Sequence, residues 1–335
     1  MKMLVTGGTG FLGSHLVERL LAQGHEVRAL ARRTSNVSLL ESEDVEVVYG
    51  DVEDFESLVE AASGIDVVFH AAGRVTPGWG RWEQFHGAIV KGTENMLAAS
   101  AGAGCSRFLY VSTGGVYGEA CEGGAAACEA TPCHITRCPD TYYESAKLQA
   151  EEAVFDNHDQ GRLQVSVVRP PAVYGPRDKL VADRLFRHVS APIVVWPEEA
   201  EPLYSVVYVT DVVECMVLAA TSDRAVGQLY NVAPPGGIRM HDFAAAMMRA
   251  TGRRRPQLTI PYGVGYAGCA VMEGWSRLRR VQDMPYLTRS ALRFLSKGVL
   301  LDGTKARQEL GWEPKVSVEE GTRRYVEWRR SRGKA

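Results

Sequence analysis

Length, composition and charge exclude several classes of protein. The chain has 335 residues, of which 45% are hydrophobic and 23% charged, a usage typical of folded globular proteins and unlike that of disordered, collagen-like or coiled-coil chains. At roughly 150 residues per domain, this length predicts two domains. The 38 Lys and Arg residues against 40 Asp and Glu residues give a net charge of −2. Since binding to nucleic acid requires a basic excess, we expect no nucleic-acid partner.

Cysteine usage and apolar stretches bear on the compartment. The chain has seven cysteines, and its start, Met1 to Val5, runs into a glycine turn and does not resemble a signal peptide. We therefore expect a cytoplasmic location. The apolar stretch Gly263 to Met272 is interrupted by glycine and is shorter than the roughly 20 residues that span a bilayer. No membrane span is predicted, while association with a membrane surface stays open.

The first 170 residues alternate β-branched runs with helical patterns, which is typical of βαβ units around a parallel sheet. A helix is expected from Ser14 to Gln23, where Gly24 ends it. The sequence therefore predicts an α/β fold with a Rossmann-type doubly wound parallel sheet in residues 1–170. Its strands are expected at Lys2–Thr6, Glu26–Ala31, Val45–Tyr49, Val67–His70, Arg107–Ser112 and Gln164–Arg169.

After Arg169 the pattern changes to proline-marked loops, and the helices there are expected to be short and scattered. We predict that residues 171–335 form mainly a smaller α+β substrate-binding lobe, with possible returns to the first domain. The last clear helix is expected from Val318 to Arg330. The charge run at 253–255 is interpreted as a solvated turn.

Three glycines follow the first predicted strand and open the first predicted helix. Gly7, Gly10 and Gly13 form a Gly-x-x-Gly-x-x-Gly turn, which lets a pyrophosphate approach the backbone and meet the N–H groups of the helix. An ordinary strand-to-helix turn is the alternative. The position between strand and helix favours dinucleotide binding.

The end of the second predicted strand bears on which dinucleotide binds. An NAD site normally has a carboxylate there, to accept from the ribose 2′-hydroxyl, but this chain has Ala31 followed by Arg32 and Arg33. Guanidinium groups suit a 2′-phosphate, so we expect NADP(H) to be preferred over NAD(H), unless both arginines are only solvated. Asp51, at the end of the third strand, either reaches the adenine or caps a helix.

A tyrosine and a lysine share one face of the next predicted helix. Tyr143 and Lys147 are spaced i, i+4, and an ammonium group beside a phenol lowers the phenol pKa from about 10 towards working pH. Ser112 and Thr113 end the preceding strand, where a hydroxyl can donate to a substrate carbonyl oxygen. Each motif alone could be an exposed pair or a polar turn. Together they predict one catalytic cleft.

These motifs resemble, in order and over essentially the whole chain, the extended short-chain dehydrogenase/reductases. The matching segments are Thr6 to Gly13, His70 to Gly73, Ser112-Thr113 before Val116-Tyr117-Gly118, Tyr143 with Lys147, Arg169 to Pro176, and Asp302 to Pro314. The resemblance implies that Tyr143 transfers the proton, that Lys147 also holds the nicotinamide ribose, and that Thr113, or else Ser112, orients the substrate oxygen. It implies a homodimer and cofactor contacts from Gly7, Thr9, Gly10, Phe11, Leu12, Gly13, Arg32, Arg33, Asp51, Val52, Ala71, Ala72, Gly73, Tyr143, Lys147, Pro170 and Val173.

Three departures place the chain nearer to bacterial 3β-hydroxysteroid dehydrogenase-like ketone reductases than to nucleotide-sugar enzymes. Ala172 stands where the nucleotide-sugar members usually have asparagine, and Tyr204 stands where they often have arginine. Losing both removes contacts to a diphosphate. Ile89 replaces the asparagine of Asn-x-x-Gly-Thr, which puts the usual polar support of the active site in doubt.

Substrate contacts are expected from two segments rich in apolar and aromatic residues, Val75 to Trp82 and Tyr262 to Trp275, unless these residues only pack the lobe. The candidate residues are Val75, Trp79, Tyr174 and Tyr204. Cys121, Cys128, Cys133 and Cys138 crowd one loop with His134, but their spacing lacks a Cys-x-x-Cys pair, so we expect neither a metal nor a disulfide.

Together, these features predict an NADP(H)-dependent oxidoreductase that interconverts a ketone and a secondary alcohol on a small hydrophobic substrate, such as a steroid or a β-keto acid. Tyr143, Lys147 and Thr113 would carry the chemistry. Two alternatives stay open. One is a nucleotide-sugar epimerase or dehydratase, and the other is a non-catalytic sensor that binds nicotinamide cofactors.

Overall fold

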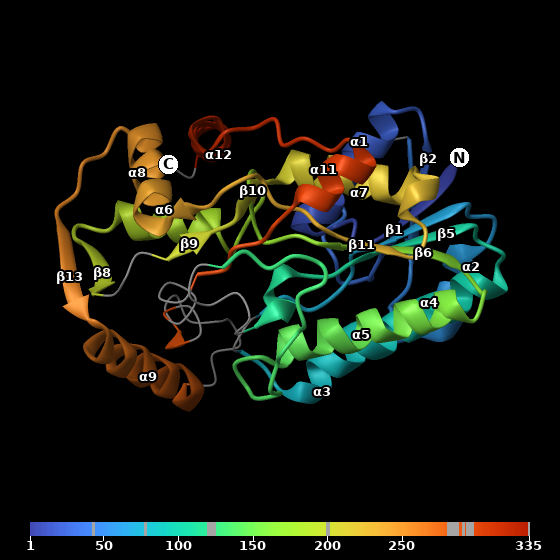
Figure 1. Ribbon diagram of the computed structural model, residues 1–335, viewed down its shortest axis with the longest axis horizontal. Helices are drawn as coiled ribbons and strands as arrows, with labels where there is room; N and C mark the ends of the chain where they lie inside the picture. Colours follow the sequence, from blue (N-terminus) through green and yellow to red (C-terminus); the bar gives the residue numbers. More distant parts are fainter. Residues whose placement is uncertain are drawn as a thin grey trace.

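A seven-stranded sheet, parallel throughout, forms the centre of the molecule (Figure 1). The computed structural model describes residues 1–41, 44–76, 79–118, 125–198, 202–279, 288–289, 292 and 298–333. The strand order is β11-β6-β5-β4-β1-β2-β3, with the topological switch between β1 and β4. This confirms the predicted doubly wound fold. The strands are β1 (Lys2–Thr6), β2 (Glu26–Ala31), β3 (Val45–Tyr49), β4 (Val67–His70), β5 (Arg107–Val111), β6 (Gln164–Arg169) and β11 (Gln228–Asn231).

Helices cover both faces of this sheet (Figure 1). One face carries α1 (Phe11–Ala22), α7 (Val209–Thr221) and α11 (Thr304–Leu310), and the other carries α2 (Phe55–Ala62), α4 (Gly92–Gly102) and α5 (Tyr142–Asp159). The strands are buried on both sides, which is why they read as continuous apolar runs. Both α7 and β11 follow residue 170, so the chain returns to the sheet after its first 170 residues.

The second lobe packs around its own apolar core, which includes Phe186, Trp196, Phe243 and Tyr325. Its helices are α6 (Ala182–Ser190), α8 (Met240–Thr251), α9 (Tyr262–Leu278) and α12 (Val318–Ser331). Short strands pair as β7 (Ala172–Tyr174) with β10 (Val206–Tyr208), β8 (Val194–Glu198) with β13 (Gln257–Pro261), and β9 (Leu203–Tyr204) with β12 (Ile238–Arg239).

Helices after residue 170 are longer than expected. The prediction of short, scattered helices was wrong, because α7, α8, α9 and α12 have 13, 12, 17 and 14 residues. The prolines that suggested short elements lie mainly in the loops between these helices. No helix in the described ranges is long and apolar enough to cross a membrane.

Element boundaries differ from the prediction at two places that matter for the cleft. Helix α1 begins at Phe11, not Ser14, with Gly10 at its N-cap and no side-chain cap. The glycine turn therefore leads directly into the helix, which brings the first backbone N–H groups to the end of β1. Strand β5 ends at Val111, so Ser112 and Thr113 belong to the connection that follows it.

Candidate active site

A cavity of about 1130 Å³ opens at the carboxyl ends of the central strands, where ligands bind in sheets of this type. Segment 177–181 of the second lobe also borders it. Most of the predicted site residues therefore share one cavity. Those that line it are Gly7, Thr9, Gly10, Phe11, Leu12, Gly13, Arg32, Asp51, Val52, Ala71, Ala72, Gly73, Val75, Ser112, Thr113, Tyr143, Lys147, Pro170 and Val173.

The glycine turn has the geometry that a dinucleotide requires. Gly7 has φ +75°, and a Cβ there would lie 2.9 Å from the carbonyl carbon of Ala71, so only glycine fits without strain. A Cβ on Gly13 would collide with the Gly7 carbonyl oxygen. The turn therefore packs tightly against β4 and α1, and the uncapped helix start is free to bind a pyrophosphate. These residues fit a nicotinamide dinucleotide.

The two arginines after β2 have different surroundings. Arg32 lines the cavity, whereas the Arg33 guanidinium lies 5.5 Å from the centre of the Tyr49 ring and is not among the cavity residues. Three polar residues that sequence reasoning missed, Ser35, Asn36 and Ser38, line the same end. The one sequence signal that could have indicated their place in the cavity is their position shortly after Arg32.

Asp51 also lies at this end of the cavity. Its Oδ1 accepts a hydrogen bond from the backbone N–H of Glu53 at 3.1 Å. The N-cap of α2 is Asp54, so Asp51 does not cap that helix.

Tyr143 and Lys147 both face the cavity from the first turns of α5. The Lys147 Nζ donates to the Val111 carbonyl oxygen at 2.6 Å and lies 4.7 Å from the centre of the Tyr110 ring. Burial lowers the pKa of Lys147 to about 8, and Glu151, one turn along α5, opposes this shift. Val111 is the last residue of β5, so this contact fixes the ammonium group at a strand end.

The predicted lowering of the Tyr143 pKa by Lys147 is not what this structure gives. Burial raises the pKa of Tyr143 well above its ordinary value, the charge of Glu144 adds to the rise, and a hydrogen bond with Thr113 opposes it. Lys147 is not among these causes, because its ammonium group is directed at the Val111 carbonyl. The phenol is therefore protonated at neutral pH.

Two hydroxyl residues follow β5 as expected. The Thr113 Oγ1 accepts from the backbone N–H of Gly115 at 3.2 Å, so its O–H is the donor in the hydrogen bond with Tyr143. Ser112 is 3% exposed, and its Oγ has no hydrogen-bond partner among the described residues. Either hydroxyl can donate to a substrate oxygen.

Glu144 is a half-buried acid with a buried Oε2, which sequence reasoning missed. A Cβ on Gly115 would lie 3.0 Å from the Glu144 Cγ and 3.6 Å from the Thr113 Oγ1, so both side chains border Gly115. The Glu144 Oε2 has no hydrogen-bond partner in the described part of the chain. Burial raises the pKa of this carboxyl to about 7.

A buried polar chain joins Thr6 at the end of β1, His70 at the end of β4 and Thr93 in α4. The His70 Nδ1 lies 2.8 Å from the Thr6 Oγ1, and the His70 Nε2 lies 3.1 Å from the Thr93 Oγ1. Thr93 donates to the Ile89 carbonyl at 2.6 Å, and Thr6 accepts from the Ala72 backbone N–H at 3.2 Å. Ile89 lies in a π-helical turn at His86–Lys91, and its carbonyl is the end of this chain of hydrogen bonds.

The candidate substrate residues separate into two groups. Val75 lines the main cavity, whereas Trp79 lines a neighbouring hollow of about 480 Å³ with Trp82 and Tyr142. Tyr174 and Tyr204 are each 1% exposed and pack in the core of the second lobe. Their predicted contact with the substrate is therefore corrected, because aromatic packing holds both rings away from the cavity lining.

The other two sequence candidates lie outside the cavity. Segment Tyr262 to Trp275 belongs to α9, and its Trp275 is 56% exposed, so it neither lines the cavity nor only packs the lobe. Cys121 lies outside the described residues. The Cys128 and Cys138 thiols contact the hydroxyl groups of Thr131 and Thr141.

Comparisons with known proteins agree with this geometry. A family model described as NAD dependent epimerase/dehydratase family matches residues 3–233. The chain is 30% identical over 322 residues to the 4-hydroxy-2-methyl-3-oxo-4-farnesyl-3,4-dihydroquinoline-1-oxide ketoreductase of Stigmatella aurantiaca, covering 96% of this chain and 94% of that protein. It is 32% identical over 336 residues to a 3 beta-hydroxysteroid dehydrogenase/Delta 5-->4-isomerase of Mycobacterium tuberculosis, covering 95% and 88%. A solved UDP-glucose 4-epimerase from Thermotoga maritima superposes with a TM-score of 0.80 at 26% identity, covering 99% of both chains.

Proposed function

The chain belongs to the NAD dependent epimerase/dehydratase family, and on that premise we propose the reaction that its cleft performs. It is an NAD(P)-dependent oxidoreductase of CH–OH and C=O groups. The proposed reaction is the NADP(H)-dependent interconversion of a ketone and a secondary alcohol on a hydrophobic substrate. The observation that carries the proposal is that Thr113, Tyr143 and Lys147 line one cavity with the glycine turn.

The proposed roles follow from the hydrogen-bonding state of each side chain. Tyr143, protonated at neutral pH because burial raises its pKa, donates its proton to the carbonyl oxygen. Thr113 turns its O–H from Tyr143 to the substrate oxygen and holds that oxygen as negative charge develops. Lys147 keeps two N–H donors besides the one given to Val111, and these hold the nicotinamide ribose. The bound cofactor supplies the hydride.

Ketone reduction requires the protonated state of Tyr143, which this structure gives at neutral pH. A phenol that stays protonated is ready to donate, whereas alcohol oxidation first needs a phenolate to accept the proton. We therefore propose ketone reduction as the working direction near neutral pH.

Arg32 supports the preference for NADP(H). It lines the cavity at the end of β2, where an NAD enzyme would have a carboxylate, and Ser35, Asn36 and Ser38 line the same end. A guanidinium group with neighbouring hydroxyl and amide groups suits a 2′-phosphate.

Two features support a hydrophobic substrate. The relatives named above act on a farnesyl dihydroquinoline oxide and on a steroid according to their names. In this chain Val75, 45% exposed, lines the cavity, and Trp79 lines the hollow beside it. Apolar groups of this kind suit a ring system or an acyl chain.

The test is ketone-dependent loss of NADPH absorbance by the purified protein, with 3-keto steroids, β-keto acids and aromatic ketones, and with NADH in parallel. Tyr143→Phe should lower turnover by at least about 100-fold while NADPH binding is retained. Tyr142→Phe is the matched control, because Tyr142 packs on Trp82 with ring centres 5.7 Å apart. Full turnover by Tyr143→Phe would refute the mechanism. Conversion of nucleotide sugars without net NADPH oxidation would replace it with the epimerase alternative.

The proposal includes a homodimer in the cytoplasm and a division into a cofactor-binding part, residues 1–170, and a mainly substrate-binding part, residues 171–335. Sedimentation velocity tests the dimer, and cell fractionation tests the location. Limited proteolysis with and without NADPH tests the division, because cofactor should protect the first part more strongly.

A further inference from the structure

Arg74 is a cation in the wall of the main cavity that the proposed reaction does not use. It comes shortly after β4 and lines the cavity together with Gly73 and Val75. The residue is half-buried, and its Nε is buried without a hydrogen-bond partner among the described residues. The guanidinium lies 5.9 Å from the centre of the Phe85 ring. Because a partly buried guanidinium without an acceptor is costly, we expect an anionic ligand at this place.

The other cations of the cavity wall either have acceptors or are exposed to water. Lys147 donates to a backbone carbonyl, and Arg177 forms an ion pair with a glutamate. Arg32 and Lys179 are exposed. Of the cations that line the cavity in the described part of the chain, only Arg74 is half-buried without an acceptor.

The acidic residues of the cavity wall leave the Arg74 charge without a partner. The carboxylates that line the cavity in the described ranges are those of Asp51, Glu53, Glu83 and Asp178. Glu83, on α3 (Trp82–Phe85), is exposed, and a Cβ on Gly87 would lie 2.7 Å from the Glu53 Oε2. The Asp178 carboxylate accepts from backbone N–H groups of its own loop at 2.7 and 3.0 Å. Within the described ranges none of the four forms an ion pair with Arg74, so its charge is available to a ligand.

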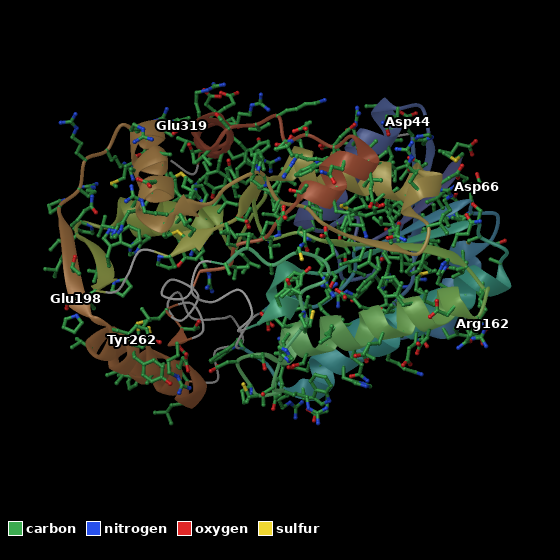
Figure 2. The ribbon with its side chains drawn as sticks, viewed as in Figure 1. Asp44, Asp66, Arg162, Glu198, Tyr262 and Glu319 are labelled. Carbon is green, nitrogen blue, oxygen red and sulfur yellow. The ribbon has the colours of Figure 1, made fainter. Side chains whose placement is uncertain are left out.

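The strand order places Arg74 at the part of the cavity where the ketone is proposed to react. Asp66, just before β4, lies at the end of the molecule opposite to Glu198 and Tyr262 of the second lobe (Figure 2), so β4 runs towards that lobe. In the sheet, β4 lies between β1 and β5. The glycine turn follows β1, and Thr113 follows β5. Arg74 therefore leaves the sheet between the site proposed for the pyrophosphate and the hydroxyl proposed to hold the substrate oxygen.

Contacts at both ends of the Arg74 side chain agree with this position. A Cβ on the preceding Gly73 would lie 3.7 Å from the Lys147 Nζ. At the guanidinium end, Phe85 packs on Tyr142 with ring centres 6.3 Å apart, and the next residue along α5 is the proposed proton donor. The guanidinium therefore lies on the side of the cavity that carries the proposed catalytic groups.

Resting on the proposed ketone reduction, we propose that Arg74 binds a carboxylate of the substrate, so that the preferred ketones are oxo acids and not neutral ring ketones. A guanidinium presents a planar set of N–H donors that matches the two oxygens of a carboxylate. In a mainly apolar pocket, one such contact fixes the orientation of the substrate, and here it directs the ketone towards Thr113 and Tyr143. A phosphate group of the cofactor is the other anion that this cavity would hold, and the experiment separates the two sources.

The experiment compares oxo acids with their own methyl esters, which have the same ketone without the charge. NADPH oxidation is measured with 3-oxo-, 4-oxo- and 5-oxododecanoate, with their methyl esters and with a 3-keto steroid. For the best of the acids, the KM of the wild type should be at least about tenfold lower than for its ester, because a charge-assisted contact is made. Arg74→Gln should remove this difference by raising the KM for the acid, while kcat and KM for the ester stay nearly unchanged. Arg74→Lys keeps the charge without the planar donors and should restore part of the difference.

The matched control is Arg137→Gln. Arg137 is an exposed arginine whose guanidinium also lies against an aromatic ring, 4.7 Å from the centre of Trp82, and it is not among the residues that line the cavity. Its loss should leave the KM values for acid and ester as in the wild type. Fluorescence titration should give the same dissociation constant for NADPH with the wild type and with Arg74→Gln. Weaker NADPH binding by Arg74→Gln, with the preference for acid over ester intact, would assign Arg74 to a cofactor phosphate and overturn the proposal.

Two further outcomes would overturn the role of Arg74 and leave ketone reduction in place. They are equal KM values of the wild type for every acid and its ester, and a kcat/KM for the 3-keto steroid above that for every oxo acid. Absence of NADPH oxidation with all of these ketones would instead refute the proposed reaction, and ligand binding then tests Arg74 by itself. With NADP⁺ present, 3-hydroxydodecanoate should raise the Tm of the wild type more than its methyl ester does, and Arg74→Gln should abolish that difference. Equal Tm shifts for acid and ester in the wild type would refute the carboxylate contact.

Discussion

Arg169, at the end of β6, holds Glu151 of α5 in a buried ion pair, one helical turn beyond Lys147. The Arg169 Nε donates to the Glu151 Oε1 at 3.0 Å, and a second bond joins the guanidinium to Oε2. The guanidinium also lies 4.7 Å from the centre of the Tyr117 ring. This pair ties the helix that carries Tyr143 and Lys147 to the end of the neighbouring strand.

Glu151→Gln should destabilise the protein by about 3–5 kcal/mol, because it leaves the Arg169 charge buried without its partner. The free energy of unfolding in urea measures this loss. The charge of Glu151 opposes the lowering of the Lys147 pKa, so the variant should lose the Lys147 charge at a lower pH than the wild type. The pH profile of NADPH binding should shift in the same direction.

The control for this change is Glu152→Gln, which removes the neighbouring carboxylate from an exposed position. It should alter stability by no more than about 0.5 kcal/mol. Equal stability of Glu151→Gln and Glu152→Gln would contradict the importance of the buried pair.

The chain Thr6–His70–Thr93 has one consistent assignment of protons. Thr93 donates its hydroxyl proton to the Ile89 carbonyl, so it must accept from His70 Nε2–H, and Thr6 must donate to Nδ1. Burial, followed by the charge of Lys147, lowers the pKa of His70 to about 3. Nitrogen-15 NMR should therefore find a neutral Nε2–H imidazole at pH 5, and a protonated ring there would refute the assignment.

Thr93→Val keeps the shape of the side chain but removes both hydrogen bonds. It leaves the buried His70 Nε2–H without an acceptor, so we expect a loss of about 1–3 kcal/mol in unfolding free energy. Ser100→Ala is the control on the same helix, because the Ser100 Oγ donates to the Met96 carbonyl at 2.6 Å within the helix and takes no part in the chain. A loss for Ser100→Ala as large as that for Thr93→Val would count against the chain.

The sequence predicted the sheet almost completely because its strands are short, β-branched and bounded by turns. Five of the six predicted strands, from Lys2–Thr6 to Gln164–Arg169, have the same bounds in the structure, and only Arg107–Ser112 ends one residue earlier. The seventh strand, Gln228–Asn231, has one apolar side chain on each face, Leu229 and Tyr230, and no β-branched residue. Nothing local distinguishes it from a loop.

The cofactor half of the site followed from local motifs, whereas the substrate half depended on tertiary packing. Gly7 and Lys147 lie in segments whose spacing already implies their place. Tyr174 and Tyr204 were misassigned because family position does not say whether a ring faces the cavity or the lobe core, which contains both. Glu144 was missed because only burial beside Gly115 separates it from a solvated helical acid.

Arg32→Ser should raise the KM for NADPH by about tenfold or more and leave that for NADH nearly unchanged, since one charge-assisted contact to a 2′-phosphate is worth roughly 1.5–3 kcal/mol. Arg33→Ser is the matched control. The Arg33 guanidinium lies over Tyr49, so its loss should affect NADPH far less. A larger effect of Arg33→Ser would exchange the roles of the two arginines. Equal effects on NADPH and NADH would remove the basis for NADP(H) preference.

Glu144 should make both stability and activity depend on pH. Its pKa rises from 4.5 to about 7 because of burial, so the folded state holds a proton that the unfolded state releases. The resulting stability is complete below about pH 4.5 and is lost as pH rises towards 7. Glu144→Gln has no carboxyl proton to lose, so the variant should gain stability relative to the wild type at pH 8 but not at pH 4, as thermal unfolding at both values will measure.

The ionised carboxyl of Glu144 also raises the pKa of Tyr143, so the pH profile of alcohol oxidation by the Glu144→Gln variant should move to lower pH. Glu152→Gln again provides the exposed control. Parallel melting curves for Glu144→Gln and the wild type across this range would show that the Glu144 carboxyl has the same pKa in the folded and unfolded states, which would contradict the effect of burial.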